Sequence, residues 1–291
     1  MFKTAGLIAS TVLFLGVVLI SFVLSSCGTS STLTQGERLS IGVISYEKGT
    51  QIVDQFTRFQ TYLAEKTGSR VELEPAFNEN LAIERIKEGT WSLVFAPPGL
   101  AALAMARYQY SAIFSLTDIG NLNSLLVVRQ DSSIREVKDL QNKNVALGQP
   151  GSATGYYLPL YNLYGLTLAG IEFAPTPKTT LEWVEKGKVA AGAVSNEQFN
   201  LYSPQLGTNL FRVLPTDTQN VPSGVVLVGP SVDRNRQEFI RRIMRTAPSI
   251  VTQQAGYLPN GQLPDYRYMT SVVERVSSIA NKLRSQPVQL Y

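Results

Sequence analysis

The chain has 291 residues, of which 44% are apolar and 16% charged, and this balance is typical of a globular protein. The formal net charge of +4 is small, and no basic run is long enough to indicate nucleic-acid binding. The sequence contains no histidine and one cysteine, Cys27, which excludes an intrachain disulfide and a Cys/His zinc site. We therefore predict no metal, no cofactor and no nucleic-acid partner.

Residues 1–27 have the layout of a secretory signal. Lys3 gives a short positive end, a long apolar run follows, and small residues precede Cys27. The ending LSSC (residues 24–27) resembles the bacterial lipobox, in which the cysteine is acylated and becomes the new N-terminus. Two alternatives remain open, because the apolar run is long enough for an uncleaved membrane anchor and Cys27 could be an ordinary cysteine. The small polar residues 28–37 predict a flexible tether.

From Leu39 onward, strand and helix patterns alternate. β-Branched and aromatic residues predict a strand over residues 39–46. Apolar residues at helical spacing then predict a helix over Thr50–Thr67, which Gly68 ends. The patterns that follow predict a strand (70–77), a helix (80–89), a strand (92–98) and a helix (100–109). This order implies an α/β lobe with a mostly parallel sheet.

The second half of the chain continues the alternation. The predicted strands are residues 124–130, 144–147, 190–195, 210–214 and 225–229. The predicted helices are a short one at 134–140, one that ends at Leu163, one at 179–187, a long amphipathic helix over Gln237–Gln254 and a closing helix at 270–285.

The loop GQPGSATGYYLP (residues 148–159) lies between a predicted strand and a predicted helix. A helix N-terminus leaves N–H groups unpaired and carries partial positive charge, and the Ser152 and Thr154 hydroxyls can donate hydrogen bonds. The loop could therefore bind an anion. The alternative is that Ser152 is simply an N-cap. The loop lacks the lysine of a P-loop and does not fit GxGxxG.

Residues 123–159 resemble a known family, the PhnD-like phosphate, phosphite and phosphonate receptors of ABC importers, which are type II solute-binding proteins. The matching pieces include Ser152-Ala153-Thr154-Gly155 and Pro159, where the family has an S-T-S-G…P loop. Residues 41–49 and 91–104 resemble two further family segments. The similarity extends roughly from Leu39 to Gly229.

The resemblance implies two α/β lobes joined by two crossing strands. Lobe one would contain residues 38–125 and 226–291, and lobe two residues 126–225. A small anionic ligand would bind between the lobes and close them by a hinge motion. The protein would be a monomeric, lipid-anchored receptor in the periplasm or at the cell surface that delivers its ligand to an ABC permease.

The resemblance also implies ligand contacts. They would come from Tyr46, Pro97, the loop residues Ser152, Ala153, Thr154, Gly155 and Tyr156, and from Ser195 and Asn196. Tyr46 could instead be a packed surface tyrosine, and Pro97 could belong to a simple turn.

Three departures from the family pattern concern the ligand. Ala153 replaces the middle threonine of S-T-S-G, Leu100 replaces a tyrosine, and Ser195 stands where many members have an aspartate. The family's cleft histidine is also missing. The ligand class is therefore open.

Other functions are compatible with parts of this sequence. A receptor for a different anion, or the ligand-sensing partner of a signalling protein, fits the same features. An enzyme lacks support because the sequence has no histidine and no GxSxG motif around Ser152. A purely structural lipoprotein is the remaining alternative.

Overall fold

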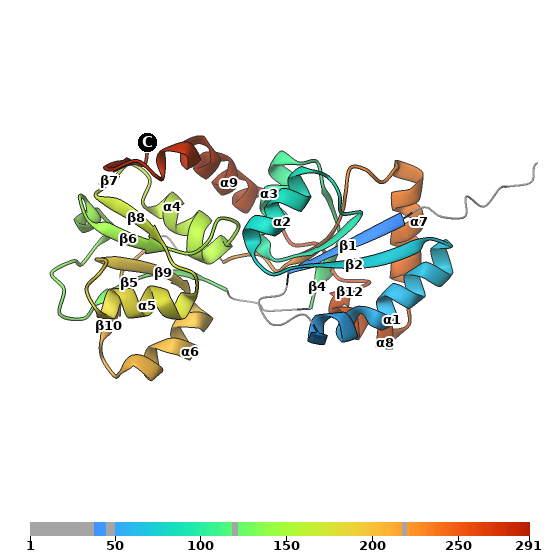
Figure 1. The fold of residues 1–291 in the computed structure, drawn as a ribbon, viewed down its shortest axis with the longest axis horizontal. Coiled ribbons are helices and arrows are strands. Elements are labelled where there is room, and N and C mark those ends of the chain that lie inside the picture. The colour runs from blue at the N-terminus through green and yellow to red at the C-terminus, as the bar shows by residue number, and fades with distance from the viewer. Residues whose placement is uncertain (1–37, 45–49, 118–121, 217–219) are drawn as a thin grey trace, which may run out of the picture. The chain divides into compact units, whose positions relative to one another are not determined.

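The computed structural model describes residues 38–44, 50–117, 122–216 and 220–291 (Figure 1). Within these residues the strands form a six-stranded sheet, a five-stranded sheet and a two-stranded pair. In the same part of the chain, none of the helices combines the length and the apolar character that crossing a membrane requires.

The first sheet has the strand order β12-β4-β11-β3-β1-β2. β1 pairs in parallel with β2 and β3, whereas β11 pairs antiparallel with β3 and β4. Consequently β1, β2, β3 and β4 all run in the same direction. The strands are β1 (Arg38–Ile44), β2 (Arg70–Ala76), β3 (Leu93–Ala96), β4 (Ser111–Leu116), β11 (Val225–Val228) and β12 (Tyr257–Leu258).

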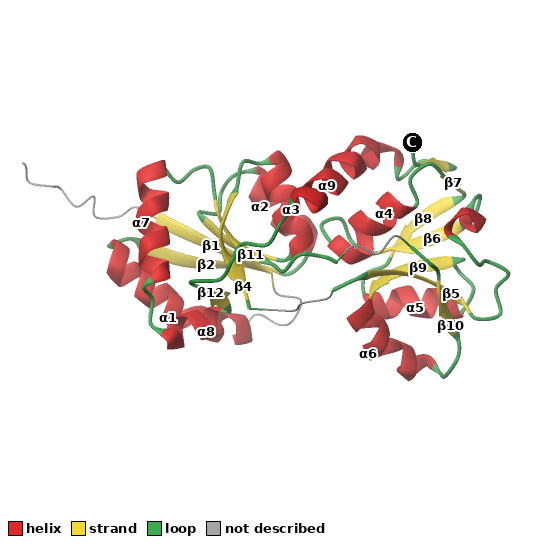
Figure 2. Cartoon of the chain, turned by 180° about the vertical axis from the view of Figure 1, so that it is seen from behind, coloured by secondary structure: helices red, strands yellow, loops and turns green. Residues whose placement is uncertain are grey.

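Helices cover both faces of the first sheet (Figure 2). α1 (Thr50–Thr67) packs its buried Phe56, Phe59 and Leu63 on one face. α7 (Arg234–Arg245) and α8 (Ser249–Ala255) belong to the same apolar cluster. α2 (Glu79–Lys87) and α3 (Pro98–Arg107) cover the other face. Burial of both faces explains why the strands are almost continuously apolar.

The second sheet has the order β10-β5-β9-β6-β8. The π-helical turn η2 (Ala153–Tyr157) and α4 (Leu158–Asn162) pack on one face, and α5 (Pro177–Glu185) and α6 (Asn196–Leu206) pack on the other (Figure 1). The 3₁₀ turn η1 (Val137–Leu140) precedes β6. The strands are β5 (Ser124–Arg129), β6 (Asn144–Leu147), β8 (Gly170–Phe173), β9 (Ala191–Ser195) and β10 (Phe211–Val213).

The chain passes from the first sheet to the second between β4 and β5, and returns between β10 and β11. The two passages meet at an antiparallel bridge, where the N–H of Val221 donates to the carbonyl of Leu122 at 3.0 Å. The predicted α/β class with two crossings is thus confirmed; most strands of each sheet run in one direction, and both sheets contain parallel and antiparallel pairs. We call the residues around the first and second sheets lobe one and lobe two; the sequence boundaries given above stay a prediction.

The C-terminal segment connects the two lobes a third time. α9 (Arg267–Ile279) contacts α3 of lobe one and α4 of lobe two, and the turn η3 (Ala280–Lys282) follows it. β13 (Val288–Gln289) then pairs with β7 (Thr167–Leu168), beside the second sheet's β8. Leu290 exchanges backbone hydrogen bonds with residues 165 and 166 at 2.8 and 3.0 Å, and its side chain is fully buried.

The prediction of one long helix over Gln237–Gln254 is wrong. The structure divides it into α7 and α8, because Pro248 has no N–H to donate and restricts the residue before it. The strands β4, β7, β8, β12 and β13 and the helix α6 were not predicted. α6 buries no residue completely and contains Pro204, so it has a weak helical pattern.

The buried C-terminal contact gives a test of this fold. Leu290→Ala should lower the free energy of unfolding by about 2 kcal/mol or more, since it empties a fully buried site. Tyr291→Ala is the matched control, because the Tyr291 side chain is 51% exposed and should change stability little. Urea unfolding followed by circular dichroism measures both. Equal effects of the two substitutions would contradict this packing.

Candidate functional site

The loop between β6 and α4 is closed on itself. The N–H of Gly148 donates to the carbonyl of Gly155 at 2.8 Å, and the backbones of these two glycines are packed together. Gly151 has φ of 104°, a conformation that favours glycine. The N–H of Tyr157 reaches back to the carbonyl of Ser152 at 3.0 Å, which winds residues 153–157 into a π-helical turn. π-Helical turns of this kind are frequent at functional sites.

Ser152 is the N-cap of this turn. Its Oγ accepts a hydrogen bond from the N–H of Gly155 at 3.0 Å. Within the described residues, the N–H groups of Ala153 and Thr154 have no hydrogen-bond partner, and neither does the Thr154 hydroxyl. Thr154 is nevertheless only 5% exposed. Among the described residues, the Thr154 hydroxyl is not one of the fully buried side-chain atoms that lack a partner, so it can bind water or a ligand. The turn therefore has donors available for an anion.

A serine on a neighbouring strand fixes this turn in place. Ser124, the first residue of β5, donates from Oγ to the carbonyl of Thr154 at 2.7 Å. Ser124 also lies directly opposite Ser195 across the β5–β9 ladder. The start of β5, the π-helical turn and the start of α6 therefore meet at one end of the second sheet.

Ser195 and Asn196 have structural partners here. Ser195 is 2% exposed, and it forms a capping box with Gln198 at the start of α6. The Asn196 Oδ1 accepts from the N–H of Asn123 at 2.9 Å, and the N–H of Asn196 donates to the carbonyl of Asn123 at 3.0 Å. These bonds hold α6 against the first crossing segment. Ligand contact by Ser195 and Asn196 stays a prediction.

Lobe one contributes the start of α3. Pro97 is its N-cap residue and Pro98 its first residue. A Cβ at Gly99 would lie 2.1 Å from the Gly151 carbonyl oxygen and 2.5 Å from the Ala153 nitrogen. Gly99 therefore lies against the backbone of the loop, with no room for even a methyl group. The structure thus brings the first turn of α3 against residues 151–153 of the loop, whereas ligand contact by Pro97 stays a prediction.

Tyr156 follows the turn and is 5% exposed. Burial raises the pKa of its phenol to about 12, because the ionised form loses its hydration. The Tyr156 ring packs against Tyr157 and Phe173 at centroid distances of 5.1 and 6.1 Å, so much of its surface belongs to the core. The signal, the tether, Cys27 and Tyr46 lie outside the described residues.

Two residues that hold this site together, Gly99 and Ser124, were not predicted from the sequence. Glu79 borders the loop through its side-chain stem, because a Cβ at Gly151 would lie 2.9 Å from the Cβ of Glu79, which is only 9% exposed. Gly99 gave the one usable signal, a glycine directly after two prolines at a helix start. Ser124 and Glu79 gave none, because their role depends on the pairing of segments that are distant in sequence.

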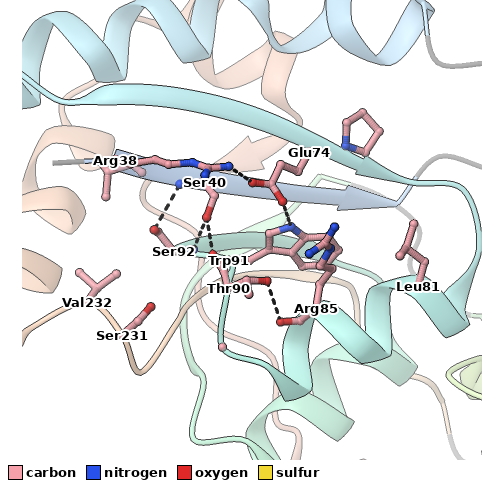
Figure 3. Close-up of a pocket in the computed structure, with 13 residues that line it drawn as sticks. Arg38, Ser40, Glu74, Leu81, Arg85, Thr90, Trp91, Ser92, Ser231 and Val232 are labelled. Carbon is pink, nitrogen blue, oxygen red and sulfur yellow. Dashed lines mark hydrogen bonds and ion pairs between the residues drawn. The ribbon is translucent and has the colours of Figure 1, made fainter. Parts of the chain in front are cut away.

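A cavity of about 630 Å³ lies elsewhere, beside the amino ends of β1 and β3 (Figure 3). Its polar groups are bonded mainly to one another. Glu74 accepts from the Arg38 guanidinium at 2.7 Å and from the Trp91 indole N–H at 3.1 Å, and Ser40 donates to the Thr90 carbonyl at 2.5 Å. Trp91 is fully buried against Gly42, where a Cβ would lie 2.2 Å from the indole ring. We interpret this network as structural.

The described residues contain no group of three Cys, Asp or Glu side chains that could hold a metal ion. The predicted absence of metals and cofactors stays a prediction, since the structure carries no ligands.

A family sequence profile matches residues 41–255 of the chain, and the family is described as the periplasmic substrate-binding protein of a phosphonate ABC transporter. None of the curated proteins matches the chain.

Solved structures show the same fold. XAC2383 from Xanthomonas citri, bound to chloride ion, superposes with a TM-score of 0.67 and 19% identity, covering 83% of this chain and 99% of that one. The same protein bound to ATP gives a TM-score of 0.65 and 21% identity over 83% and 98% of the two chains. PhnD1 from Prochlorococcus marinus, in complex with methylphosphonate, superposes with a TM-score of 0.56 and 18% identity, covering 84% of this chain and 98% of that one. The similarity confirms the expected type II two-lobed fold.

The contact at Gly99 predicts an effect on lobe closure. Gly99→Ala should shift the population away from this closed arrangement by roughly 5- to 150-fold, because overpacking costs about 1–3 kcal/mol. Spin labels on Val53 and Leu201, which are 44% and 58% exposed, would report the lobe separation in a Cys27→Ser background.

Pro98→Ala is the matched control for this experiment, since it changes the same helical turn without adding a group at the contact. It should leave the label distances unchanged. An unchanged distance distribution in Gly99→Ala would contradict the close approach of the two backbones.

Proposed function

The chain belongs to the family of periplasmic substrate-binding proteins of phosphonate ABC transporters, and from this premise we propose that it binds a small oxyanion such as phosphonate, phosphite or phosphate between its two lobes. The observation that carries the proposal is the start of the π-helical turn. There the N–H groups of Ala153 and Thr154 and the Thr154 hydroxyl have no partner among the described residues. The Ala153 nitrogen lies against Gly99 of lobe one in this arrangement, so a ligand reaches that donor when the lobes separate.

The donors at this place are neutral backbone and hydroxyl groups. Backbone N–H groups at the start of a helical turn favour negative charge, and they are fixed before the ligand arrives. Such preorganised donors offset the desolvation of an anion without a fully charged partner. An oxyanion with one or two negative charges is therefore the ligand that this arrangement supports best.

The family also supports the proposed biological role. A substrate-binding protein captures its ligand and releases it unchanged to a permease, so we propose transport without catalysis and no cofactor. A lobe closure that buries the ligand would present both lobes to the permease together. We propose that the protein acts as a monomer.

The alternative function that we propose for the same site is sensing of a different organic anion for a signalling partner. The replacement of the family's aspartate by Ser195 favours a change of ligand class, because serine provides no negative charge for a ligand amine or a protonated anion. XAC2383, which shares the fold, was solved with ATP. ATP therefore belongs in any ligand screen.

The localisation that we propose combines the family with the lipobox resemblance. The family is periplasmic, and acylation of Cys27 would attach the receptor to the membrane through its N-terminus. Three acyl chains satisfy the need for more than one lipid signal in stable anchoring.

The test of ligand binding uses calorimetry with phosphate, phosphite, methylphosphonate, 2-aminoethylphosphonate, sulfate and ATP. Thr154→Val should weaken the bound ligand by roughly 10- to 150-fold, since a hydrogen bond to a charged group is worth about 1.5–3 kcal/mol. It should not lower the stability of the free protein, because the hydroxyl has no partner in it.

Ser152→Ala should weaken binding and also cost about 1 kcal/mol of stability, because it removes an N-cap. Asp233→Ala is the matched control, since it removes the N-cap of α7 in lobe one and should change stability alone. Binding that is unaffected by Thr154→Val would place the ligand elsewhere, and no binding of any phosphorus oxyanion would exclude the phosphonate-type assignment.

The lipid anchor has its own test. Cys27→Ser should abolish labelling of the protein by an alkyne fatty acid in bacteria, because the thiol that accepts the lipid is missing. Ser26→Ala keeps a small residue before the cysteine and should retain the label. Labelling of Cys27→Ser would show that the lipid is attached at another place.

A further inference from the structure

Helix α7 of lobe one presents a basic face to the solvent. Its other side buries Ile240, Ile243 and Met244 in the apolar cluster that it shares with α1. Residues three and four positions apart lie on the same side of a helix, so the outer side carries a row of charged residues and Arg242 beside it. We call this set the arginine face, and its members are Arg234, Glu238, Arg241, Arg242 and Arg245. Four arginines and one glutamate give the face a formal charge of +3.

This charge is largely free of carboxylate partners. Within the described residues, Arg241 is the one arginine of the face with an ion pair, to Glu238 at 3.5 Å. The arginines at the starts of β1 and β2 are different, because Arg38 and Arg70 both pair with Glu72 at 2.7 Å. The positive charge of the arginine face is therefore available to a partner outside the chain.

A cavity of about 350 Å³ opens at the C-terminal end of this face. Arg241 and Arg245 line it, together with the apolar Phe114 and Leu263. The Nε of Arg241 is buried and has no hydrogen-bond partner within the described residues, which is unfavourable unless a ligand or water satisfies it. Like charges four residues apart on a helix also repel each other. A phosphate group bound to both guanidinium groups removes both costs, since arginine pairs well with phosphate oxygens.

Exposed leucines lie beside these arginines. Leu258 and Leu263 are both 43% exposed. Leu258 is next to the cavity, because a Cβ at Gly261, which lines it, would lie 2.8 Å from the Leu258 Cβ. Arginines that flank exposed apolar side chains are typical of a surface that lies in the headgroup region of a membrane, where the phosphates meet the acyl chains.

The start of the described chain lies on the same side of lobe one. Arg38, the first residue of β1, lines the cavity of Figure 3 together with Ser231 and Val232, which lie just before α7 in the chain. As a flexible chain, the predicted tether (28–37) would span roughly 18 Å, and α7 is about as long. A membrane that holds the lipid on Cys27 is thus within reach of the arginine face.

We propose that the arginine face of α7, with the cavity at its C-terminal end, binds the anionic phospholipid surface of the membrane to which the receptor is attached. This goes beyond the ligand site, and it rests on the proposed lipid anchor only for the side from which the membrane approaches. Headgroup phosphates bind the guanidinium groups, and Leu258 and Leu263 contact the apolar layer beneath them. Because α7 and β12 belong to lobe one, lobe two stays free to move.

Vesicle flotation tests this with residues 36–291, which form a compact unit of their own. Vesicles of phosphatidylglycerol and phosphatidylcholine in equal parts should bind the protein roughly 100-fold more tightly than vesicles of phosphatidylcholine alone, since each net positive charge near an anionic surface contributes about fivefold. Salt at about 0.5 M should remove the difference, because it screens exposed charges over a few ångströms.

Variants localise the interaction. Arg241→Gln combined with Arg245→Gln should weaken binding to the anionic vesicles roughly 25-fold. Lys178→Gln combined with Lys186→Gln is the matched control, since it removes the same charge from exposed positions at the two ends of α5 in lobe two, and it should leave binding unchanged. Glu238→Gln should strengthen binding about fivefold, a gain that poor folding cannot produce.

The full-length chain gives a second measurement in both kinds of vesicle, to which its N-terminal apolar run attaches it. In a Cys27→Ser background, a fluorescent label at Asn235→Cys, an exposed position of α7, should be quenched by headgroup-linked quenchers in anionic vesicles and much less in neutral ones. The same label at Leu201→Cys in lobe two, where Leu201 is 58% exposed, should be quenched equally little in both.

The outcomes separate this inference from the proposed function. Equal binding to both kinds of vesicle, or an equal loss in the lysine and arginine variants, overturns it. Binding to neither kind also overturns it and leaves the arginine face to an acidic protein surface. Ligand binding between the lobes is measured by calorimetry and is not affected by any of these results. Lipid labelling that persists in Cys27→Ser would contradict the anchor, whereas the vesicle binding of residues 36–291 would still stand.

Discussion

The arrangement of this protein depends on a contact between two stretches of backbone. Gly99, in the first turn of α3, lies against the carbonyl of Gly151 and the nitrogen of Ala153, where an added Cβ would be only 2.1 and 2.5 Å away. Side chains at either glycine would keep the two lobes apart. Glycine is required at position 151 for two further reasons. Its φ of 104° favours glycine, and a Cβ there would meet Glu79 and Leu100. The two glycines therefore determine how closely the lobes can approach and where a ligand between them can lie.

The same contact explains how a site without a charged donor can serve an anion. The turn after Gly151 is held by Ser124 from one side and by its own cap, Ser152, from the other, so its remaining N–H groups are fixed in direction. Preorganised dipoles need no reorganisation when the ligand binds, and exclusion of water by the closed lobes strengthens each of them. A charged partner would add affinity but would also need desolvation.

Sequence reasoning predicted the elements whose pattern is local. α1 begins and ends at the expected residues because its apolar positions repeat at helical spacing and Gly68 adopts φ of 66°. The prediction of one long helix over Gln237–Gln254 was wrong because Pro248 interrupts it. α6 was not predicted because tertiary contacts rather than an apolar periodicity stabilise it. For the site, the loop from Gly148 to Pro159 was recognisable by its composition. Ser124 gave no signal and Gly99 gave only that of a glycine after two prolines, because the function of both residues comes from pairing across more than 25 residues of chain. Hydrogen-bond partners such as that of Asn196 also follow only from the folded chain.

The C-terminal helix restricts the ways in which the lobes can separate. α9 buries Met269, Val272 and Val273 in an apolar cluster that contains residues of both lobes, including Leu100 and Leu158. Exposing one such side chain costs about 1.5–3 kcal/mol, so an opening that pulled α9 away from either lobe would be unfavourable. The bridge between Leu122 and Val221 ties the two crossing segments to each other in the same way. The opening of least cost separates Gly99 from Gly151 while α9 keeps its contacts with α3 and α4. Such an opening is a rotation about the α9 side of the molecule, and it exposes the π-helical turn.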